Sequence, residues 1–488
     1  MELELKFALP TQDPTLLQKQ LARVPLIGRR RPKRQALHNT YYDTPGHALQ
    51  QQRVALRVRQ IGDAQQPQWL QTLKIGGSAD SAFSQRGEWE LALPNSQLSS
   101  AMLADTPWME LDADGQLYPA LRPVFTTTFE RLSWTVALAG ARVEIALDRG
   151  SVLMDGHSTP LCELEIELLS GAPDALFEAA QQISQQLCLL PLHLSKAERA
   201  YRLAAGTLDA PLRAKPARLS QDMDLGALAQ GVLREAFLQF TANLYTVLHS
   251  DAPEVLHQAR IGWRRFKSAL QFFQQRGAHS TLPSLQPLQA LLAQMTVLRD
   301  REVAQSEVLP AHARAYQAGD AQRLLQWQQL DAALAQDIDQ QRARLRQLLT
   351  TPAVGQTLLQ ILRWLELGSI QAGHKPGKKK GAAPEKYVRK RMQSLAQDLK
   401  AAQLQSGDAQ ARHRVRILSK RLRYGVESLR ALLPKKRAER WHRIATETQT
   451  RIGLERDCQQ AIGIAEQLQA ADSIVAFLRG AAFGAGLG

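Results

Sequence analysis

Acidic side chains recur at every second position in two stretches of the sequence, the opening MELELKF and the later CELEIEL (162–168). In the first stretch, Glu2, Glu4 and Lys6 alternate with leucines and a phenylalanine. Alternate side chains of an extended strand share one face, so the carboxylates would stand about 7 Å apart. Crowding like charges in this way costs free energy unless a cation or a set of basic groups compensates it. Carboxylates arranged like this could bind a divalent metal ion.

Basic side chains follow the same alternating pattern in other stretches. Arg57 and Arg59 share one face of RVALRVR (53–59), and RGEWE (86–90) places Arg86 on a face with two glutamates. A guanidinium offers a bidentate fork and an ammonium a compact charge, so both suit a polyvalent anion such as a polyphosphate. A single alternating strand is usually a solvent-exposed surface. Here, acidic and basic side chains both recur on the charged faces of several strands. This recurrence instead favours one interior site for a metal–polyphosphate complex.

Two different periodicities divide the chain. Up to about residue 204, apolar and polar residues alternate in short stretches separated by turns, which is typical of antiparallel strands with a few helices. From about residue 222 the spacing becomes helical, and the proline-bearing stretch between predicts a linker at 205–217. We therefore predict an α+β protein of two domains. Residues 1–204 would be rich in strands, residues 218–475 all-helical, and residues 476–488 a flexible tail.

Positive charge is concentrated in the second domain. The 488 residues carry a formal net charge of +15, yet residues 1–204 hold 20 Lys+Arg against 22 Asp+Glu. An excess of this size implies a polyanionic partner, which could be nucleic acid, an anionic membrane surface or a phosphate polymer. No apolar run is long enough to span a bilayer, and the three scattered cysteines form no metal-finger motif. We expect a cytoplasmic protein without a membrane-spanning segment.

The order of the charged motifs in residues 1–204 resembles that of the CYTH superfamily, the triphosphate tunnel metalloenzymes. The Glu-x-Glu-x-Lys opening is followed by YYDTP (41–45), the Arg-x-Arg pair, QTLKI (71–75), FER (129–131), EIALDRG (144–150), CELEIEL and HLSKAERAY (193–201). The resemblance covers nearly the whole domain. It implies an eight-stranded antiparallel β tunnel with flanking helices, whose charged side chains point inward.

The same resemblance implies roles for individual side chains of the tunnel. The bases would grip the triphosphate; they are Lys6, Arg57, Arg59, Lys74, Arg86, Arg131 and Lys196. The acids would bind Mg²⁺ or Mn²⁺; they are Glu2, Glu4, Asp148, Glu163 and Glu165. Catalysis, by water attacking a terminal phosphorus in line, would depend most directly on Glu2, Glu4, Lys6, Glu163 and Glu165. The roles of Glu88, Glu90 and Glu167, which share the charged faces, stay open.

The helical domain contains an internal repeat of basic residues. The pattern H-x-x-R-x-x-x-[KR]-R-x-[KR] begins at His257 and again at His413, and an Arg-Asp pair follows each copy, at Arg299 and at Arg456. Residues at offsets 0, 3, 7 and 10 form one stripe along a helix. A basic stripe can be a solvated face, but like charges at helical spacing repel, so their repetition favours a bound polyanion. The residues concerned are His257, Arg260, Arg264, Arg265, Lys267, His413, Arg416, Lys420, Arg421 and Arg423.

This repeat resembles the CHAD domain, a helical module that occurs fused to CYTH domains. The resemblance covers about residues 218–475. It implies a duplicated helical bundle whose basic cavity binds inorganic polyphosphate through the ten residues named above. The stripes lack the aromatic stacking positions and the motifs expected of a nucleic-acid-binding surface, so a specific nucleic-acid partner is not expected.

Together, the two resemblances predict a metal-dependent inorganic triphosphatase that hydrolyses tripolyphosphate and also binds long-chain polyphosphate. A class IV adenylate cyclase or a thiamine triphosphatase is an alternative within the superfamily, although no site for a base or a thiazolium ring is recognisable. A non-enzymatic protein of polyphosphate granules is a further alternative, against which the intact series of acids and bases argues. Polyphosphate binding would allow association with such granules in either case.

Overall fold

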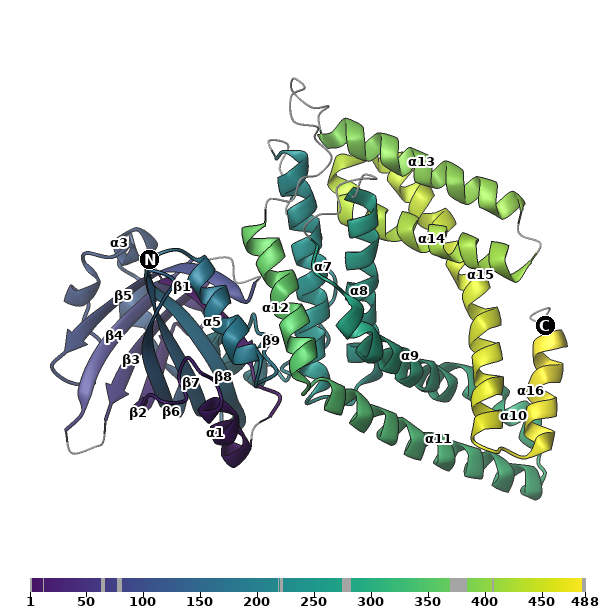
Figure 1. Cartoon of the computed structure of the whole chain (residues 1–488), viewed down its shortest axis with the longest axis horizontal. Helices are drawn as coiled ribbons and strands as arrows, with labels where there is room; N and C mark the ends of the chain where they lie inside the picture. Colours follow the sequence, from purple (N-terminus) through teal and green to yellow (C-terminus); the bar gives the residue numbers. More distant parts are fainter. Residues whose placement is uncertain are drawn as a thin grey trace. The chain divides into compact units, whose positions relative to one another are not determined.

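A computed structural model describes residues 2–484 of the chain, apart from residues 12, 63–65, 77–80, 218, 220–222, 274–281, 369–383 and 406–407. The chain forms two compact units (Figure 1). The first unit consists of Met1–Pro211, Leu248–Ser250 and Leu349–Leu367. The second consists of Leu212–Val247, Asp251–Leu348 and Gly368–Gly488.

The first unit is a closed antiparallel barrel. Its strands are β1 (Glu2–Ala8), β2 (Lys33–Asp43), β3 (Val54–Ile61), β4 (Gln68–Ile75), β5 (Phe83–Leu93), β6 (Arg122–Leu138), β7 (Ala141–Met154), β8 (His157–Ser170) and the two-residue β9 (Leu190–Pro191). Pairing runs in the order β5-β4-β3-β2-β6-β7-β8-β1-β9, and β1 also pairs with β5, which closes a ring of eight strands. The prediction of an eight-stranded antiparallel tunnel is confirmed.

The alternating sequence places charged side chains inside this barrel and apolar ones outside. On β1, Leu5 and Phe7 are fully buried on the outer face, whereas Lys6 lines the interior. Helix α5 (Asp174–Ser184) covers that outer face by packing against β1, β7 and β8. The rings of Phe83 and Phe177 meet there with centroids 5.5 Å apart. Apolar burial outside the wall therefore stabilises a barrel whose centre is polar.

Shorter helices cover other parts of the barrel. They are α1 (Pro14–Ala22), α2 (Ala48–Gln51), α3 (Trp108–Leu111), α4 (Leu117–Ala120) and α6 (Lys196–Ala204). Leu56 and Leu73, which point outward from β3 and β4, share a buried cluster with Leu49 of α2 and Trp108 of α3. Helix α6 instead contacts β7 and β8 and carries a basic residue of the candidate site.

Helix α12 (Pro352–Leu367) belongs to the first unit, although its sequence lies within the predicted helical domain. It packs against α5 and β9. Gly355 permits this approach, because a Cβ there would stand 2.6 Å from the backbone nitrogen of Leu189. Gln356 also donates a 3.0 Å hydrogen bond to the backbone carbonyl of Ser184. The two units therefore do not follow a single division of the chain, since residues 349–367 group with the barrel.

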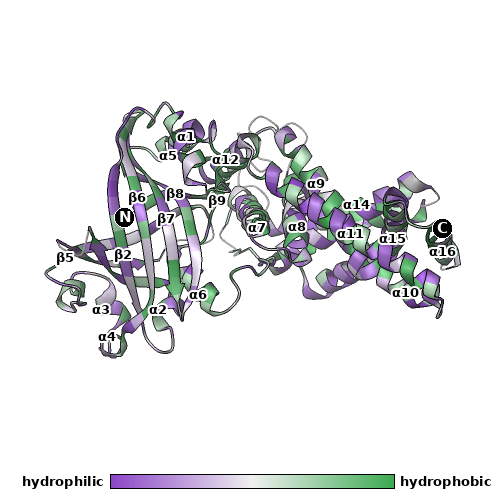
Figure 2. Cartoon of the chain, turned by 90° about the horizontal axis from the view of Figure 1, so that it is seen from below, coloured by the Kyte–Doolittle hydropathy of each residue, from purple (hydrophilic) through white to green (hydrophobic). Residues whose placement is uncertain are grey.

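The second unit is mostly helical, as predicted. Its helices are α7 (Leu225–Val247), α8 (Pro253–Phe273), α9 (Gln289–Val303), α10 (Leu309–Gln317), α11 (Ala321–Leu348), α13 (Pro384–Leu404), α14 (Ala409–Leu429), α15 (Lys435–Gln467) and α16 (Asp472–Gly484). Hydrophilic and hydrophobic residues are interspersed along helices such as α11 and α15 (Figure 2). This distribution is typical of helices that bury one face and expose the other.

The internal repeat of the sequence maps onto pairs of helices. The two basic copies lie on α8 and α14, which contact each other. The two Arg-Asp pairs lie on α9 and α15, which also contact each other. Equivalent parts of the two copies are thus neighbours within the second unit.

Two smaller expectations concern the connecting and terminal segments. The predicted linker, residues 205–217, contains no helix or strand. Residues 476–484, which were expected to belong to a flexible tail, form the end of α16, and residues 485–488 lie outside the described residues. Among the described residues, no helix combines the length and the apolar character needed to cross a membrane.

Candidate active site

A cavity of about 440 Å³ occupies the barrel interior and is lined mainly by charged side chains. Its acids are Glu2, Glu4, Glu88, Glu90, Glu144, Glu165 and Glu167. Its bases are Lys6, Arg57, Arg59, Lys74, Arg86, Arg131 and Lys196. The structure therefore brings to one cavity all seven bases that the sequence singled out.

Strand register explains how residues distant in the sequence meet. Lys6 on β1 lies opposite Glu165 on β8, and Glu163 on β8 lies opposite Asp148 on β7. Asp148 in turn lies opposite Arg131 on β6. Directly opposed residues share a face, with Cβ atoms about 5 Å apart. The register consequently places acids next to bases and, for Glu163 and Asp148, one acid next to another on the inner wall.

Lys196 reaches the acids from the first turn of α6. Ser195 caps this helix through a capping box, which fixes the position of the residue that follows. The Nζ atom lies 2.8 Å from Asp148, 2.5 Å from Glu163 and 2.9 Å from Glu165. Burial alone would lower the pKa of Lys196, but the three carboxylates raise it well above its usual value. The ammonium group therefore stays charged inside the barrel.

Arg131 and Lys6 complete this network. Arg131 forms a bidentate pair with Asp148, with both bonds 2.7 Å long, and donates to Glu165 at 2.6 Å. The Nζ atom of Lys6 is 2.9 Å from Glu165 and 3.6 Å from Glu163. Burial opposes the charge of Glu165, yet the surrounding bases hold its pKa well below the usual range. An anion that enters the cavity must share these bases with the carboxylates.

A second set of bases comes from β3 and is less fully paired. Arg59 donates from Nε to Asn39 at 2.8 Å, and Arg57 donates to the hydroxyl of Tyr41 at 3.3 Å. Carboxylates of β5 lie 3.7 Å from Arg57 and 3.9 Å from Arg59. Burial, followed by repulsion from neighbouring guanidinium groups, lowers the pKa of Arg59 to about 10. A phosphate next to Arg59 would relieve this repulsion.

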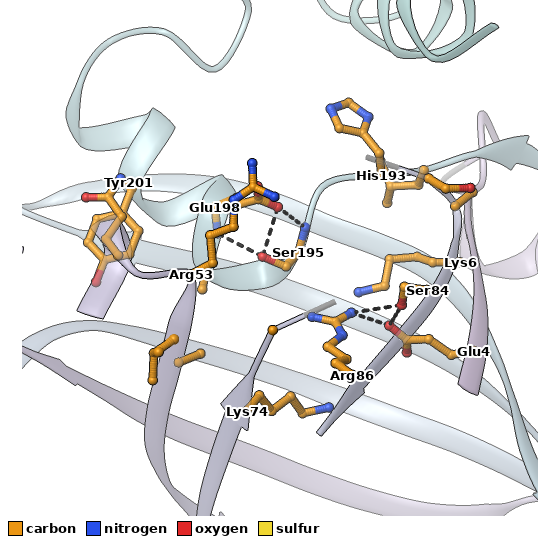
Figure 3. A pocket seen from close by; sticks show the side chains of 18 of the residues that line it. Glu4, Lys6, Arg53, Lys74, Ser84, Arg86, His193, Ser195, Glu198 and Tyr201 are labelled. Atoms are coloured by element: carbon orange, nitrogen blue, oxygen red, sulfur yellow. Dashed lines mark hydrogen bonds and ion pairs between the residues drawn. The ribbon is translucent and has the colours of Figure 1, made fainter. Parts of the chain in front are cut away.

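Glu2 and Glu4 line the same cavity but pair with other bases. The Nζ atom of Lys74 is 3.0 Å and 2.9 Å from the two carboxylate oxygens of Glu2. Arg86 donates to Glu4, as does the hydroxyl of Ser84 at 3.0 Å (Figure 3). The sequence analysis missed Ser84, because a serine two residues before an arginine in a strand gives no specific signal.

Three of the predicted metal-binding acids converge. One oxygen atom each from Asp148, Glu163 and Glu165 lies within 4.8 Å of the other two. Glu163 is fully buried, and its Oε2 accepts no hydrogen bond from any described residue. Arg199, which the sequence analysis also missed, approaches that oxygen to 3.8 Å. Carboxylate oxygens are the donors that Mg²⁺ and Mn²⁺ prefer, so this cluster fits a divalent ion.

A further set of acids is built around Glu167. It lies opposite Glu4 on β1 and opposite Glu144 on β7. Burial and then the charge of Glu2 raise the pKa of Glu167 to about 7. Glu2 and Glu4, which are outside the three-acid cluster, belong with this set. Glu144 had no predicted role, although the alternation in EIALD places it on the same face as Asp148.

A second cavity, of about 310 Å³, adjoins the barrel interior (Figure 3). The charged residues that line both cavities are Glu4, Lys6, Lys74 and Arg86. Other residues that line the second cavity come from α6, from the segment before it and from the segment around the start of β3, and they include Arg53, His193, Glu198 and Tyr201. A substrate group that extends beyond the barrel interior would enter this space.

In the second unit, the basic stripes of α8 and α14 influence one another. Burial, followed by repulsion from Arg264, Arg416 and Arg456, lowers the pKa of Lys420 to about 7. Burial and Arg264 also lower the pKa of Arg260 to about 10. Such shifts require positive groups from both copies of the repeat to lie near one another. The predicted stripes therefore form one basic surface within this unit, which an anion would stabilise.

The other predicted members of the stripes are placed differently. Burial lowers the pKa of His257 to about 4, so this imidazole is neutral. Lys267 and His413 are exposed, and Arg423 lies 3.5 Å from a carboxylate of its own helix. Two residues at offset 8 of the pattern line a separate cavity: Arg265 and Arg421. The physical reason is that each step along a helix turns a side chain by about 100°, which carries offset 8 away from the stripe.

The two Arg-Asp pairs of the repeat also interact, although no role was assigned to them from the sequence. Arg456 of α15 donates to both carboxylate oxygens of Asp300 on α9, at 3.2 Å and 3.0 Å. Arg456 in turn repels Lys420 and so contributes to its lowered pKa. The fixed spacing of these pairs behind each histidine was the signal that could have identified Arg456.

Two family models match the chain in succession. The CYTH domain model matches residues 1–201, and the CHAD domain model matches residues 231–466. An inorganic triphosphatase of Haemophilus influenzae is 31% identical over 206 residues, which are 42% of this chain and 55% of that protein. The chain thus spans about half the length of this curated relative.

The two domains are also similar to solved structures. The CHAD domain of the plant Ricinus communis is 25% identical, with a TM-score of 0.47, and the match covers 56% of this chain and 91% of that chain. A putative adenylyl cyclase from Hippeastrum, described as having a dominant triphosphatase activity, is 19% identical, with a TM-score of 0.30. That match covers 42% of this chain and 96% of the other. From the two family models we conclude that the chain consists of an N-terminal CYTH domain and a C-terminal CHAD domain.

Proposed function

We propose that this protein is a metal-dependent inorganic triphosphatase, which hydrolyses tripolyphosphate to pyrophosphate and phosphate. One observation carries the proposal: seven bases surround a single barrel cavity, and Glu165, which lines it, belongs to a cluster with the fully buried Asp148 and Glu163 that fits a divalent ion. Tripolyphosphate is compact and highly charged, and its complex with a metal ion needs both kinds of group. The similarity to the inorganic triphosphatase of Haemophilus influenzae supports the same chemistry.

In this proposal, the bases bind phosphate oxygens and stabilise the charge that develops during attack on the terminal phosphorus. Arg57 and Arg59 are suited to the first contact, because their hydrogen bonds go to neutral side chains. Lys6, Arg131 and Lys196 would turn from their carboxylate partners toward the phosphate. Preorganised positive groups of this kind act most strongly where water is excluded.

The acids would hold the metal ion and activate water. Asp148, Glu163 and Glu165 form the cluster that fits an ion, and we propose that Glu2 and Glu4 contribute to metal binding as well. Mg²⁺ or Mn²⁺ bound there would neutralise phosphate charge and lower the pKa of a coordinated water. Glu167 is suited to accept a proton from the attacking water, because its pKa is about 7.

Phosphate release from four substrates tests the proposal. Tripolyphosphate, ATP, thiamine triphosphate and long-chain polyphosphate are assayed with and without Mg²⁺ or Mn²⁺. We expect tripolyphosphate to give the highest kcat/KM, and no turnover without a divalent ion. Conversion of ATP to cyclic AMP or a preference for thiamine triphosphate would identify one of the alternative activities. No turnover of any substrate with either metal would contradict an enzymatic role.

Replacing Glu4 by glutamine should raise the metal concentration needed for half-maximal activity by about tenfold or more. The amide keeps the shape of the side chain but loses the negative charge that attracts the ion. A metal titration of tripolyphosphate hydrolysis provides the measurement. The matched control is Glu110→Gln, an exposed glutamate of α3, which should leave the titration unchanged. An unchanged titration for Glu4→Gln would remove Glu4 from the metal site.

We propose in addition that the CHAD domain binds inorganic polyphosphate through the stripes of α8 and α14. The lowered pKa values of Lys420 and Arg260 support this, because several cations share a partly buried surface. A polyphosphate chain offers repeated anionic groups that could pair with cations from both helices. The Arg-Asp pair of α15 would contribute Arg456 to the same surface.

Polyphosphate binding by the full chain should weaken as the pH rises from about 6 to about 8. Below pH 7 Lys420 is already charged, whereas above pH 7 it must first take up a proton, which costs free energy. Affinity is measured by titration with long-chain polyphosphate at several pH values. In Lys420→Gln the affinity should be lower at low pH and its pH dependence flatter. Lys400→Gln, at an exposed position of α13, is the control. Equal pH dependence in the two variants would contradict the role of Lys420.

A further inference from the structure

A separate cavity of about 130 Å³ lies among α7, α8, α13 and α14 of the second unit. It is lined by Arg265 and Arg421, which occupy the same position in the two copies of the basic repeat. The stripe residues Arg264 and Lys420 do not line it. The duplication has therefore produced two composite basic sites, one from the stripes and one from the residues that directly follow Arg264 and Lys420.

Arg265 is placed unusually for an arginine. It is only 3% exposed, and its hydrogen bonds go to two neutral groups, Gln239 at 2.7 Å and Ser428 at 3.4 Å. Its buried Nε has no hydrogen-bond partner, and no ion pair of Arg265 occurs within the described part of the chain. Burial lowers its pKa, and more distant carboxylates offset this only in part. A buried guanidinium without a close counter-charge is costly, and an anion in the cavity would supply one.

The rest of the cavity wall combines apolar groups with more charge. Three arginines and one aspartate line it, so the wall is positive overall; they are Arg265, Arg391, Arg421 and Asp398. Arg391 and Asp398 are exposed on α13, which leaves the cavity open to solvent on that side. The apolar lining includes Phe272, Phe273, Leu395 and Leu418. The volume is close to the roughly 150 Å³ of an apolar cavity that binds benzene.

A single side chain connects this cavity with the stripes. Tyr424 is 2% exposed and lines the cavity, while its hydroxyl accepts a 3.0 Å hydrogen bond from Nε of Arg264. Arg423 also donates to this hydroxyl, at 3.5 Å. Tyr424 thus lines the cavity and also accepts hydrogen bonds from two arginines of the stripes. The two basic sites are neighbours but have different linings.

We propose that this cavity binds a small organic anion with a ring-sized apolar body and a carboxylate or phosphate monoester head. The head would meet Arg265, and the body would pack against the phenylalanines and leucines. The apolar lining distinguishes this ligand from polyphosphate, which has no apolar part and for which the stripes are proposed. The inference does not depend on triphosphatase activity.

Calorimetric titration of the full chain tests the proposal with four probes. Benzoate and phenyl phosphate carry both the ring and the charge, benzyl alcohol carries the ring alone, and inorganic phosphate carries the charge alone. Ser394 lines the cavity at an exposed position of α13, so Ser394→Trp should block it. Binding that this substitution abolishes is therefore assigned to the cavity. Gln393→Trp, at an exposed position outside the lining, is the matched control. We expect one or both ring anions to bind at least about tenfold more tightly than benzyl alcohol.

The arginines supply the second part of the test. Arg265→Gln should weaken the binding of the ring anions by at least about tenfold. If Arg265→Gln does not fold, Arg421→Gln, at a half-buried position, should also weaken their binding. Tripolyphosphate hydrolysis should be unaffected, because the barrel is a separate unit. A preference for benzoate or for phenyl phosphate would identify the head group. Any of four results would overturn the proposal. The first two are equal affinities of the wild type and Ser394→Trp for every probe, and equal affinities of the wild type for benzoate, phenyl phosphate and benzyl alcohol. The other two are binding of inorganic phosphate but of no other probe, and an unchanged affinity for the ring anions in the folded arginine variants.

Discussion

Replacing Lys196 by methionine should lower kcat/KM for tripolyphosphate by at least about 100-fold. Its ammonium group lies within 2.9 Å of three carboxylates of the barrel, those of Asp148, Glu163 and Glu165. We expect Lys196 to make two charged hydrogen bonds to the substrate. Each contributes about 1.5 kcal/mol or more, which together account for the expected loss. Methionine keeps the length of the side chain, so the change isolates the charge.

The same substitution should also destabilise the fold. Two buried carboxylates and the partly buried Glu165 lose a shared cation, and breaking a buried pair in this way costs about 3–5 kcal/mol in the free energy of unfolding. Denaturant unfolding measures this loss, and kinetics are recorded only where the variant is folded. Lys33→Met removes an exposed lysine of β2 and should change neither quantity. A loss of stability with unchanged kcat/KM would make Lys196 a structural residue and would weaken the proposed substrate site.

Neutralising both Arg264 and Lys420 with glutamine should weaken binding of long-chain polyphosphate by at least about tenfold. The two residues are equivalent positions of the repeat, and each belongs to the basic surface formed by α8 and α14. Fewer phosphate contacts also release fewer counterions. The slope of log affinity against log salt should therefore fall by roughly 1.5 for two lost contacts. Titrations of the full chain at several salt concentrations give both quantities.

A charge-matched control separates a specific site from general attraction. Lys390→Gln combined with Lys400→Gln removes two exposed lysines of α13 and lowers the net charge by the same amount. This control should retain the affinity for polyphosphate, and both double variants should retain tripolyphosphate hydrolysis. If both double variants lost the same amount of affinity for polyphosphate, the stripes would act only as nonspecific positive charge. Equal affinity of the wild type for duplex DNA and polyphosphate, at matched phosphate concentration, would do the same.

The sequence by itself determined the class of each domain and which side chains face the barrel interior. In a strand, alternate residues share a face whatever the rest of the fold does. The inward direction of Glu4, Lys6, Arg57 and Arg59 could therefore be predicted from spacing, once several charged faces were seen together. Helical spacing predicted the stripes of α8 and α14 for the same local reason.

Only the tertiary structure decided which groups meet. Register between strands brings Glu163 to Asp148 and places Glu4 beside Glu167, and nothing local to either strand fixes that pairing. For the same reason, a separate group of acids around Glu167 could not be foreseen.

Long-range packing also overruled two assignments made from linear order. Residues 349–367 group with the barrel, because Gly355 lets α12 approach the backbone at Leu189. Helix geometry turns Arg265 away from the stripe residue that it directly follows, and the packing of α7, α13 and α14 decided that it lines another cavity. The direction of a side chain on its own helix or strand follows from local geometry, which the sequence specifies. The group it meets depends on how separate elements pack, because burial and charge pairing across the whole unit together set that arrangement.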